Sequence, residues 1–228
     1  MQAQPISGIH GTWIVENDQH TVTVFIPWET PDSNACSRLA DSVSSLCHVP
    51  FRLVLFPVLD WDGDLTPWPA PGVFKGQHFG GFASQTLSVL LDHIIPTYSD
   101  EFNLIAGYSL AGLFSLWALT QTPRFRGAAS CSGSLWYPGF TEYMRNASLP
   151  ADSLVYLSLG DLEEKARHPV LRTIGQETRQ MAGLLSGRPE VHWSTLVMNP
   201  GNHFAEPDER LSKGIAALIN HLPSTVSG

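Results

Sequence analysis

Apolar and polar residues along this chain form two kinds of segment. Short runs that are almost wholly apolar predict buried strands, and they occupy residues 51–57, 103–108, 127–130, 153–159 and 191–198. Segments with apolar residues three and four positions apart predict helices, and they occupy residues 33–47, 82–95, 110–119, 170–185 and a last stretch beginning near Pro207. The helix at 82–95 is expected to stop at Pro96. Residues 58–81 have no such period and are rich in Pro, Gly and Trp, which predicts a functional loop.

Two segments near the N-terminus, 10–15 and 21–26, alternate apolar and polar residues. Polar residues 16–19 separate them, so they predict an antiparallel hairpin. After it, strands alternate with helices, which predicts an α/β fold with a mostly parallel twisted sheet and helices on both faces. No linker or repeat interrupts the chain, so we expect a single domain over residues 1–228 without a separate lid domain. Functional residues are then expected at the carboxyl ends of the strands.

The composition narrows the classes of function. With 43% hydrophobic and 15% charged residues, the chain is a compact globular protein. The net charge of −8, without any Lys/Arg run, argues against binding of nucleic acid. No segment reaches the roughly 18 apolar residues of a membrane span, and the N-terminus does not resemble a signal peptide, so we expect no membrane association and a cytoplasmic location. Cys36, Cys47 and Cys131 fit reduced thiols. A monomer and a homodimer are both compatible with these features.

The chain is organised around residues 103–112, Asn-Leu-Ile-Ala-Gly-Tyr-Ser-Leu-Ala-Gly. An apolar strand breaks at Gly107, presents Ser109 and continues as a helix that is apolar on nearly every side. This context is typical of a nucleophile elbow, in which a strained turn exposes a reactive serine. The strain requires small residues two positions before and after the serine, and Gly107 and Ala111 occupy those positions. The alternative is an ordinary strand–helix junction with a capping serine.

A serine nucleophile needs a histidine as base and a carboxylate that orients the histidine. In a fold with this elbow, the acid and then the histidine follow the serine along the chain. Only His203, of the four histidines after Ser109, lies in a Gly/Asn/Pro turn directly after a predicted strand. The acid should follow the preceding strand, where Glu163 comes three residues after a glycine. Asp161 is the alternative acid, and a charged loop that only caps the next helix is the alternative for the whole cluster.

An oxyanion hole needs two backbone N–H donors. One is predicted at Leu110, directly after the serine, and the other in the loop after strand 51–57, at Asp60 or Trp61. The three acids within residues 60–64 do not follow the calcium-loop pattern, because a glycine precedes the third acid and Pro71 stands where a bidentate glutamate is required. No metal and no organic cofactor is therefore predicted.

Four blocks of sequence in this order are more specific than the elbow alone. They are Gly107-Tyr108-Ser109-Leu110-Ala111-Gly112, Ser132-Gly133-Ser134-Leu135-Trp136-Tyr137, Gly160-Asp161-Leu162-Glu163 and Gly201-Asn202-His203-Phe204. They resemble the putative-esterase family of α/β hydrolases, which includes S-formylglutathione hydrolase, feruloyl esterases, enterochelin esterases and mycolyltransferases. Residues 60–71 look like small bacterial esterases of that family. The resemblance runs from about residue 51 to the last helix, and implies the α/β-hydrolase fold, a Ser109–Glu163–His203 triad and a two-step acyl-enzyme route.

No lid insertion is obvious, so short loops should build the substrate pocket. Tyr108, Trp68, Trp136 and Tyr137 are candidates to line it, because aromatic walls suit an acyl or aryl group. Ordinary packing of these side chains onto the sheet is the alternative. The sequence therefore predicts a serine carboxylic-ester hydrolase that acts on a small-molecule ester. Acyl transfer by the same triad, hydrolysis of amides or peptides, and a non-catalytic binding module remain as alternatives.

Overall fold

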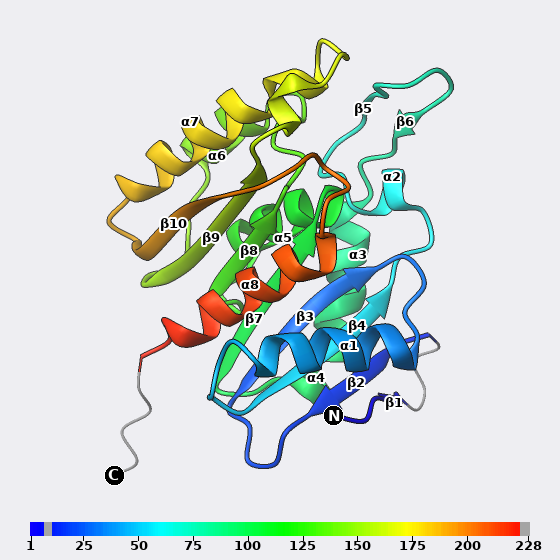
Figure 1. Cartoon of the computed structure of the whole chain (residues 1–228), viewed down its shortest axis with the longest axis vertical. Helices are drawn as coiled ribbons and strands as arrows, with labels where there is room; N and C mark the ends of the chain where they lie inside the picture. Colours follow the sequence, from blue (N-terminus) through cyan, green and yellow to red (C-terminus); the bar gives the residue numbers. More distant parts are fainter. Residues whose placement is uncertain (7–10, 224–228) are drawn as a thin grey trace.

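The computed structural model describes residues 1–6 and 11–223, and within them the main sheet has eight strands in the order β1-β2-β4-β3-β7-β8-β9-β10 (Figure 1). The strands are β1 (Gln4–Pro5), β2 (Trp13–Glu16), β3 (Val22–Trp28), β4 (Phe51–Pro57), β7 (Phe102–Tyr108), β8 (Gly127–Cys131), β9 (Ser153–Gly160) and β10 (Val191–Asn199). From β4 to β10 all neighbours in the sheet are parallel. At one edge of this sheet, β1 pairs antiparallel with β2, and β2 pairs antiparallel with β4. The prediction of a mostly parallel sheet is confirmed.

The connections between the strands hold helices and one small two-stranded sheet. The helices are α1 (Ser33–Ser44), α2 (Trp61–Asp64), α3 (Ala83–Val89), α4 (Ile95–Tyr98), α5 (Leu110–Gln121), α6 (Phe140–Asn146), α7 (Ile174–Ser186) and α8 (Pro207–Asn220), with short turns η1 (Leu90–Ile94), η2 (Glu163–Lys165) and η3 (Leu171–Thr173). The small sheet pairs β5 (Ala70–Pro71) with β6 (His78–Phe79). Among the residues described, no helix combines the length and the apolar character that crossing a membrane requires.

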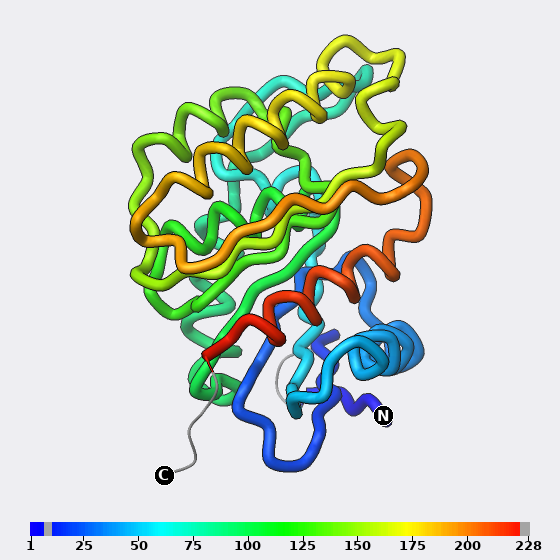
Figure 2. The backbone as a smooth tube through the Cα atoms, turned by 60° about the vertical axis from the view of Figure 1, so that its left-hand side comes forward, coloured from blue at the N-terminus to red at the C-terminus, as the bar shows by residue number. Residues whose placement is uncertain are grey.

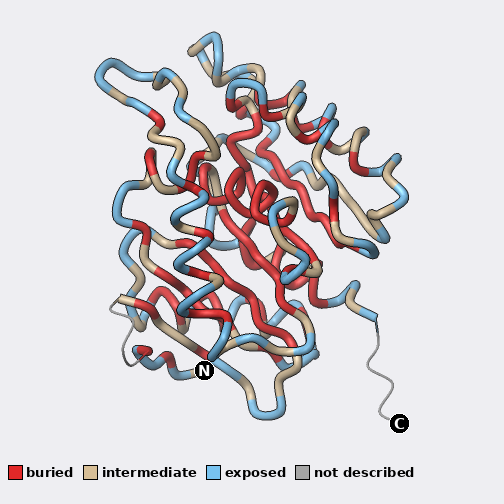
Figure 3. Tube along the Cα trace, turned by 180° about the vertical axis from the view of Figure 1, so that it is seen from behind, coloured by how far each residue is buried: buried red, intermediate tan, exposed pale blue. Residues whose placement is uncertain are grey.

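Helices cover both faces of the sheet, as predicted. Helices α1 and α8 lie on one face, and α3, α5 and α7 lie on the other (Figures 1 and 2). Successive residues of a strand point to opposite faces: Phe25 of β3 belongs to the core under α5, whereas Val24 and Ile26 belong to the core under α1 and α8. The central strands and α5 are buried along their length (Figure 3). Burial of α5 on every side explains why its sequence is apolar on nearly every side.

The predicted pairing of the first two strands is wrong. Strand β4 lies between β2 and β3, antiparallel to β2 and parallel to β3. Residues 22–27 of β3 are all buried, which a place in the middle of the sheet provides and an edge hairpin would not. The exposed end of β2 at Glu16 fits a place near the edge. His10, with which the first strand was expected to begin, lies outside the described residues.

The helical segment after residue 82 also differs from its prediction. It does not stop at Pro96 but runs through α3, the π-helical turn η1 and α4 to Tyr98. Proline is tolerated in the first turn of a helix, where its missing N–H has no partner to lose. The wide turn places Pro96 in such a position, because the N–H of Ile95 donates to the carbonyl of Leu90, five residues earlier.

Candidate active site

Ser109 stands alone between strand β7 and helix α5. Its backbone has φ 58° and ψ −123°, a region that residues other than glycine rarely occupy. The turn is held by its own backbone, since Ser109 N–H donates to Cys131 O over 3.1 Å and Ser109 O accepts from Ser134 N–H over 3.0 Å. The strained turn that the small residues predicted is therefore present.

His203 follows β10 and reaches Ser109 across the carboxyl end of the sheet. The distance from His203 Nε2 to Ser109 Oγ is 3.1 Å, and the distance from His203 Nδ1 to Glu163 Oε2 is 2.8 Å. Gly201, with φ +99°, turns the chain two residues before the histidine. The hydroxyl of Tyr108 donates to His203 O over 2.6 Å and fixes the backbone of the histidine itself. Three side chains from three separate loops thus form one hydrogen-bonded line.

Glu163 is buried at the end of this line, with 6% of its surface exposed. Its second oxygen, Oε1, accepts hydrogen bonds from Gly160 N–H at 2.7 Å, Ser132 Oγ–H at 2.7 Å and Arg210 Nη1–H at 3.0 Å. Burial alone would raise the pKa of Glu163, but hydrogen bonds from His203, Ser132 and Gly160 outweigh it and hold the pKa below its ordinary value. Glu163 is therefore an anion at neutral pH and can accept a hydrogen bond from a protonated His203 Nδ1.

Asp161, the alternative acid, has a different position. Its Oδ1 accepts the N–H of Gly201 over 2.8 Å, so it joins the loop after β9 to the loop that carries His203. This contact uses the carboxylate to shape backbone rather than to orient the imidazole. The geometry thus separates the two acids that the sequence left open.

For two of the three candidate oxyanion donors, the part of the chain that the structure describes offers the backbone N–H no acceptor. Leu110 and Trp61 are the first residues of α5 and α2, and an N–H at the start of a helix has no acceptor within the helix. The N–H of Asp60 instead donates to Asp64 Oδ2 over 3.0 Å. Among the two loop residues proposed from the sequence, Trp61 is therefore the one with an amide left for a ligand.

The aromatic side chains expected to line a pocket divide into two groups. Tyr137 is only 2% exposed and donates its hydroxyl to Trp68 O, so in this structure it packs the loop, and its contact with substrate stays a prediction. Tyr108 anchors the histidine loop, as described above. Trp68 donates from Nε1 to Pro138 O over 2.9 Å and, like Trp136, remains partly exposed. Trp68 and Trp136 stay predictions.

Sequence reasoning missed Arg210, which is 1% exposed and contacts Glu163, Ser132 and Tyr108 through Nη1. A signal was present. Arg210 stands four and eight residues before Gly214 and Leu218, on the face of α8 that is buried. An arginine on the apolar face of a helix needs a buried partner.

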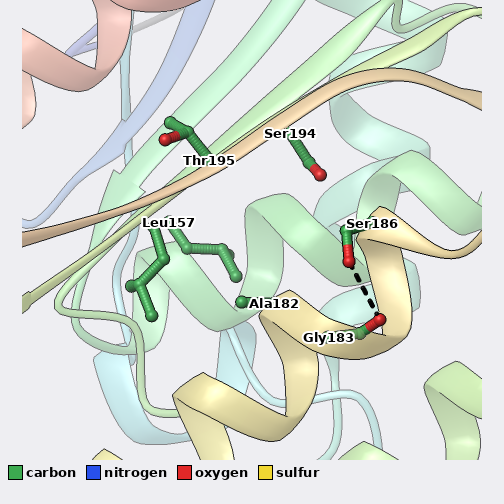
Figure 4. A pocket seen from close by; sticks show the side chains of 7 residues that line it. Leu157, Ala182, Gly183, Ser186, Ser194 and Thr195 are labelled. Carbon is green, nitrogen blue, oxygen red and sulfur yellow. Dashed lines mark hydrogen bonds between the residues drawn. The ribbon is translucent and has the colours of Figure 1, made fainter.

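A cavity of about 260 Å³ lies elsewhere, between α7 and the strands β9 and β10 (Figure 4). Leu157, Ala182, Ser186 and Thr195 are among the residues that line it, and none of the residues of the hydrogen-bonded line does. The cavity is therefore separate from the site at Ser109.

Comparisons with known proteins identify the family of this chain and solved structures with a similar fold. A family model described as "Putative esterase" matches residues 49–184. The fold is similar to the siderophore hydrolase EstA from Aspergillus nidulans (TM-score 0.70, 16% identity, 97% of this chain and 94% of that chain covered). It is also similar to an IroE-like serine hydrolase from Shewanella oneidensis (TM-score 0.72, 16% identity, 92% of this chain and 75% of that chain covered). A third similar structure is the enterobactin esterase FES from Shigella flexneri (TM-score 0.60, 18% identity, 92% of this chain and 55% of that chain covered). No curated protein sequence matches the chain.

Proposed function

The chain belongs to the putative-esterase family of carboxylic-ester hydrolases, and from that premise we propose that it hydrolyses small to medium acyl esters through an acyl-enzyme intermediate on Ser109. The observation that carries this proposal is the line Ser109 Oγ–His203–Glu163, with distances of 3.1 and 2.8 Å. Nucleophile, base and orienting acid each lie within hydrogen-bond reach of the next, which is the geometry that acyl transfer to a serine requires.

In the first step, Ser109 Oγ attacks the ester carbonyl carbon while His203 Nε2 takes the hydroxyl proton. The carbonyl oxygen becomes an oxyanion, which the amides of Leu110 and Trp61 stabilise. Glu163 holds Nδ1 protonated, so that Nε2 is free to act as a base, and stabilises the imidazolium that forms. His203 then gives its proton to the leaving alcohol, the C–O bond breaks, and the acyl group stays on Ser109.

In the second step, His203 activates a water molecule that attacks the acyl-enzyme, and Ser109 recovers its proton as the acid leaves. The side chain of His203 is 33% exposed, which supports access of water to Nε2. Acyl transfer to another alcohol would require that water be kept from this position. Exposure of the base therefore favours hydrolysis over transfer.

The test is a pre-steady-state assay with p-nitrophenyl acetate and p-nitrophenyl butyrate. The wild type should show a burst of p-nitrophenol followed by turnover, and Ser109→Ala should lose both. A fluorophosphonate probe should label the wild type at Ser109, located by mass spectrometry of the peptide. Turnover that persists in Ser109→Ala, or label on another residue, would contradict the proposal.

The acyl preference is measured in the same format. A series of p-nitrophenyl esters from acetate to decanoate gives the acyl length, and kcat/KM is the quantity compared. A siderophore ester belongs in the panel because two of the similar folds carry names of siderophore-hydrolysing enzymes. Absence of turnover on the whole panel, with no label on Ser109, would favour a binding module.

A further inference from the structure

Arg210 is a buried cation that ties three segments together. Its guanidinium lies within hydrogen-bond distance of five acceptors: Glu163 Oε1 at 3.0 Å, Ser132 Oγ at 3.0 Å, Tyr108 OH at 3.2 Å, Pro200 O at 2.9 Å and Asn202 O at 3.0 Å. Nη1 makes the first three contacts and Nη2 makes the last two. One nitrogen therefore serves the acid, and the other serves the backbone that carries His203.

Resting on the function proposed above, we propose that Arg210 is a positioning residue of this esterase. It holds the loop that carries His203 next to Glu163, and its positive charge partly offsets the negative charge of the carboxylate that the imidazole faces. Its guanidinium forms these hydrogen bonds with other groups than the side chains of Ser109 and His203. Its effect passes through the carboxylate, the two carbonyls and the hydroxyl of Tyr108. That hydroxyl accepts from Arg210 and itself donates to His203 O over 2.6 Å.

The fold makes room for the guanidinium at a specific place. A Cβ at Gly160 would lie 2.9 Å from both Nη1 and Nη2 of Arg210 and still nearer to the carbonyl oxygen of Gly201. The glycine that precedes the acid by three residues therefore leaves room both for the backbone of the His203 loop and for the guanidinium. A lysine could not replace the contacts, because one ammonium cannot span both the carboxylate and the carbonyls of Pro200 and Asn202 as a planar fork does.

A stabilising role alone does not account for this residue. A buried ion pair costs the desolvation of both charges, and apolar residues of similar volume often give equal or greater stability. Arg210 also carries a buried Nε without a hydrogen-bond partner among the described residues, which adds to the cost. In this proposal the network serves to fix the distance from His203 Nδ1 to Glu163 Oε2, on which the reaction depends.

The charge of Arg210 has its own consequence for the pH profile. The guanidinium opposes the carboxylate of Glu163, so it weakens the attraction of the site for a protonated imidazole. The titratable and charged groups joined by hydrogen bonds to His203 or its loop are Glu163 and Asp161 after β9, Tyr108 at the elbow and Arg210 on α8. Glu206 lies in the loop of His203 itself, Asp208, Glu209 and Lys213 follow on α8, and Glu164 and Lys165 follow Glu163. Removing the charge of Arg210 alone leaves the negative charge of Glu163 without this neighbouring cation. The acidic limb of the profile of kcat/KM against pH should therefore move to higher pH.

The experiment compares Arg210→Gln, Arg210→Lys and the wild type on p-nitrophenyl butyrate from pH 5 to 9. Arg210→Gln should lower kcat about 100-fold with KM changed by less than about threefold, and should move the acidic limb up by about one pH unit. Arg210→Lys should return the limb to the wild-type position but recover only part of kcat. Lys213→Gln removes a charge on the same helix from an exposed pair with Glu209, and should change neither quantity.

A purely structural role predicts otherwise: kcat would fall only with the folded fraction, measured by thermal unfolding, and the acidic limb would stay in place. That result overturns the inference. If Arg210→Gln does not fold, Tyr108→Phe tests the same link without removing a charge. It should lower kcat about tenfold and leave the limb unmoved, whereas unchanged kcat overturns the inference. A wild type without turnover or label on Ser109 would instead overturn the proposed function and this inference together.

Discussion

Gly107 and Ala111 face each other across the elbow with no room for another atom. A Cβ at position 107 would lie 2.7 Å from the Cβ of Ala111 and still nearer to the carbonyl group of that residue. Strand β7 and helix α5 can therefore meet at Ser109 only because position 107 has no side chain. The close approach of two backbones creates the conformation that exposes the serine.

Gly107→Ala should therefore disrupt the elbow rather than the rest of the fold. Because the clash is with backbone atoms, it cannot be relieved by rotating a side chain, and we expect a loss of about 1–3 kcal/mol in the free energy of unfolding. Fluorophosphonate labelling of Ser109 should fall more steeply than stability. Thermal unfolding and labelling are measured on one preparation. Full labelling with wild-type stability would contradict this account.

Replacing Ser109 should reveal the strain in its backbone. Ser109→Ala and Ser109→Gly both remove the hydroxyl, but only glycine accepts φ 58° without strain. The strain of about 1–3 kcal/mol exceeds the entropic cost of glycine, about 0.5–1 kcal/mol. Ser109→Gly should be the more stable of the two inactive variants by about 1 kcal/mol in urea unfolding. Equal stability would mean that the turn is relaxed.

The amide of Trp61 can be removed without removing the helix. Trp61 is the first residue of α2, where proline is tolerated, and Asp60 before it is extended, with φ −120° and ψ 96°. Trp61→Pro should lower kcat by about 10²–10³-fold through loss of an oxyanion donor. Trp61→Ala keeps the amide and controls for the indole, so its loss of kcat should be much smaller. Equal kcat for the two variants would place the second donor elsewhere.

Glu163 and Asp161 should differ in their effect on the reaction. Glu163→Gln replaces the carboxylate with a neutral amide. The amide has no negative charge to keep the proton on His203 Nδ1 or to stabilise the imidazolium, so kcat should fall by about 10³–10⁴-fold. Asp161→Asn can still accept the N–H of Gly201 through its carbonyl oxygen, so kcat should change by less than about threefold. The measurement is steady-state turnover of p-nitrophenyl acetate at pH 8. The reverse order of effects would make Asp161 the triad acid.

Stability at low pH should depend on Glu163. The folded-state pKa of this carboxyl lies below its ordinary value of 4.5, so the stability it contributes is complete above pH 4.5 and is lost as the pH falls through the folded-state pKa. One group can change the free energy of unfolding by at most about 1.4 kcal/mol per pH unit. Urea unfolding from pH 7 to 3 should show a shallower acidic decline for Glu163→Gln than for the wild type. Asp161→Asn controls for the loss of a carboxylate from the same loop.

Much of the fold and the order of the site could be predicted from the sequence, because those features are written in neighbouring residues. The period of apolar residues marked the parallel strands and their covering helices, since each element buries its own face. Gly107 and Ala111 marked the strained turn at Ser109, since the steric requirement acts over four residues. His203 could also be selected from local sequence, because it follows a predicted strand and a glycine turn precedes it.

The tertiary structure decided what depends on residues far apart in the chain. The position of β4 between β2 and β3 follows from burial in the assembled sheet and not from the alternation within either strand. Glu163 is distinguished from Asp161 only by the loop that brings His203 to one of them. Arg210 meets the acid across 47 positions of sequence. A local pattern can show that a charge must be buried, but only the folded chain determines which partner offsets its desolvation.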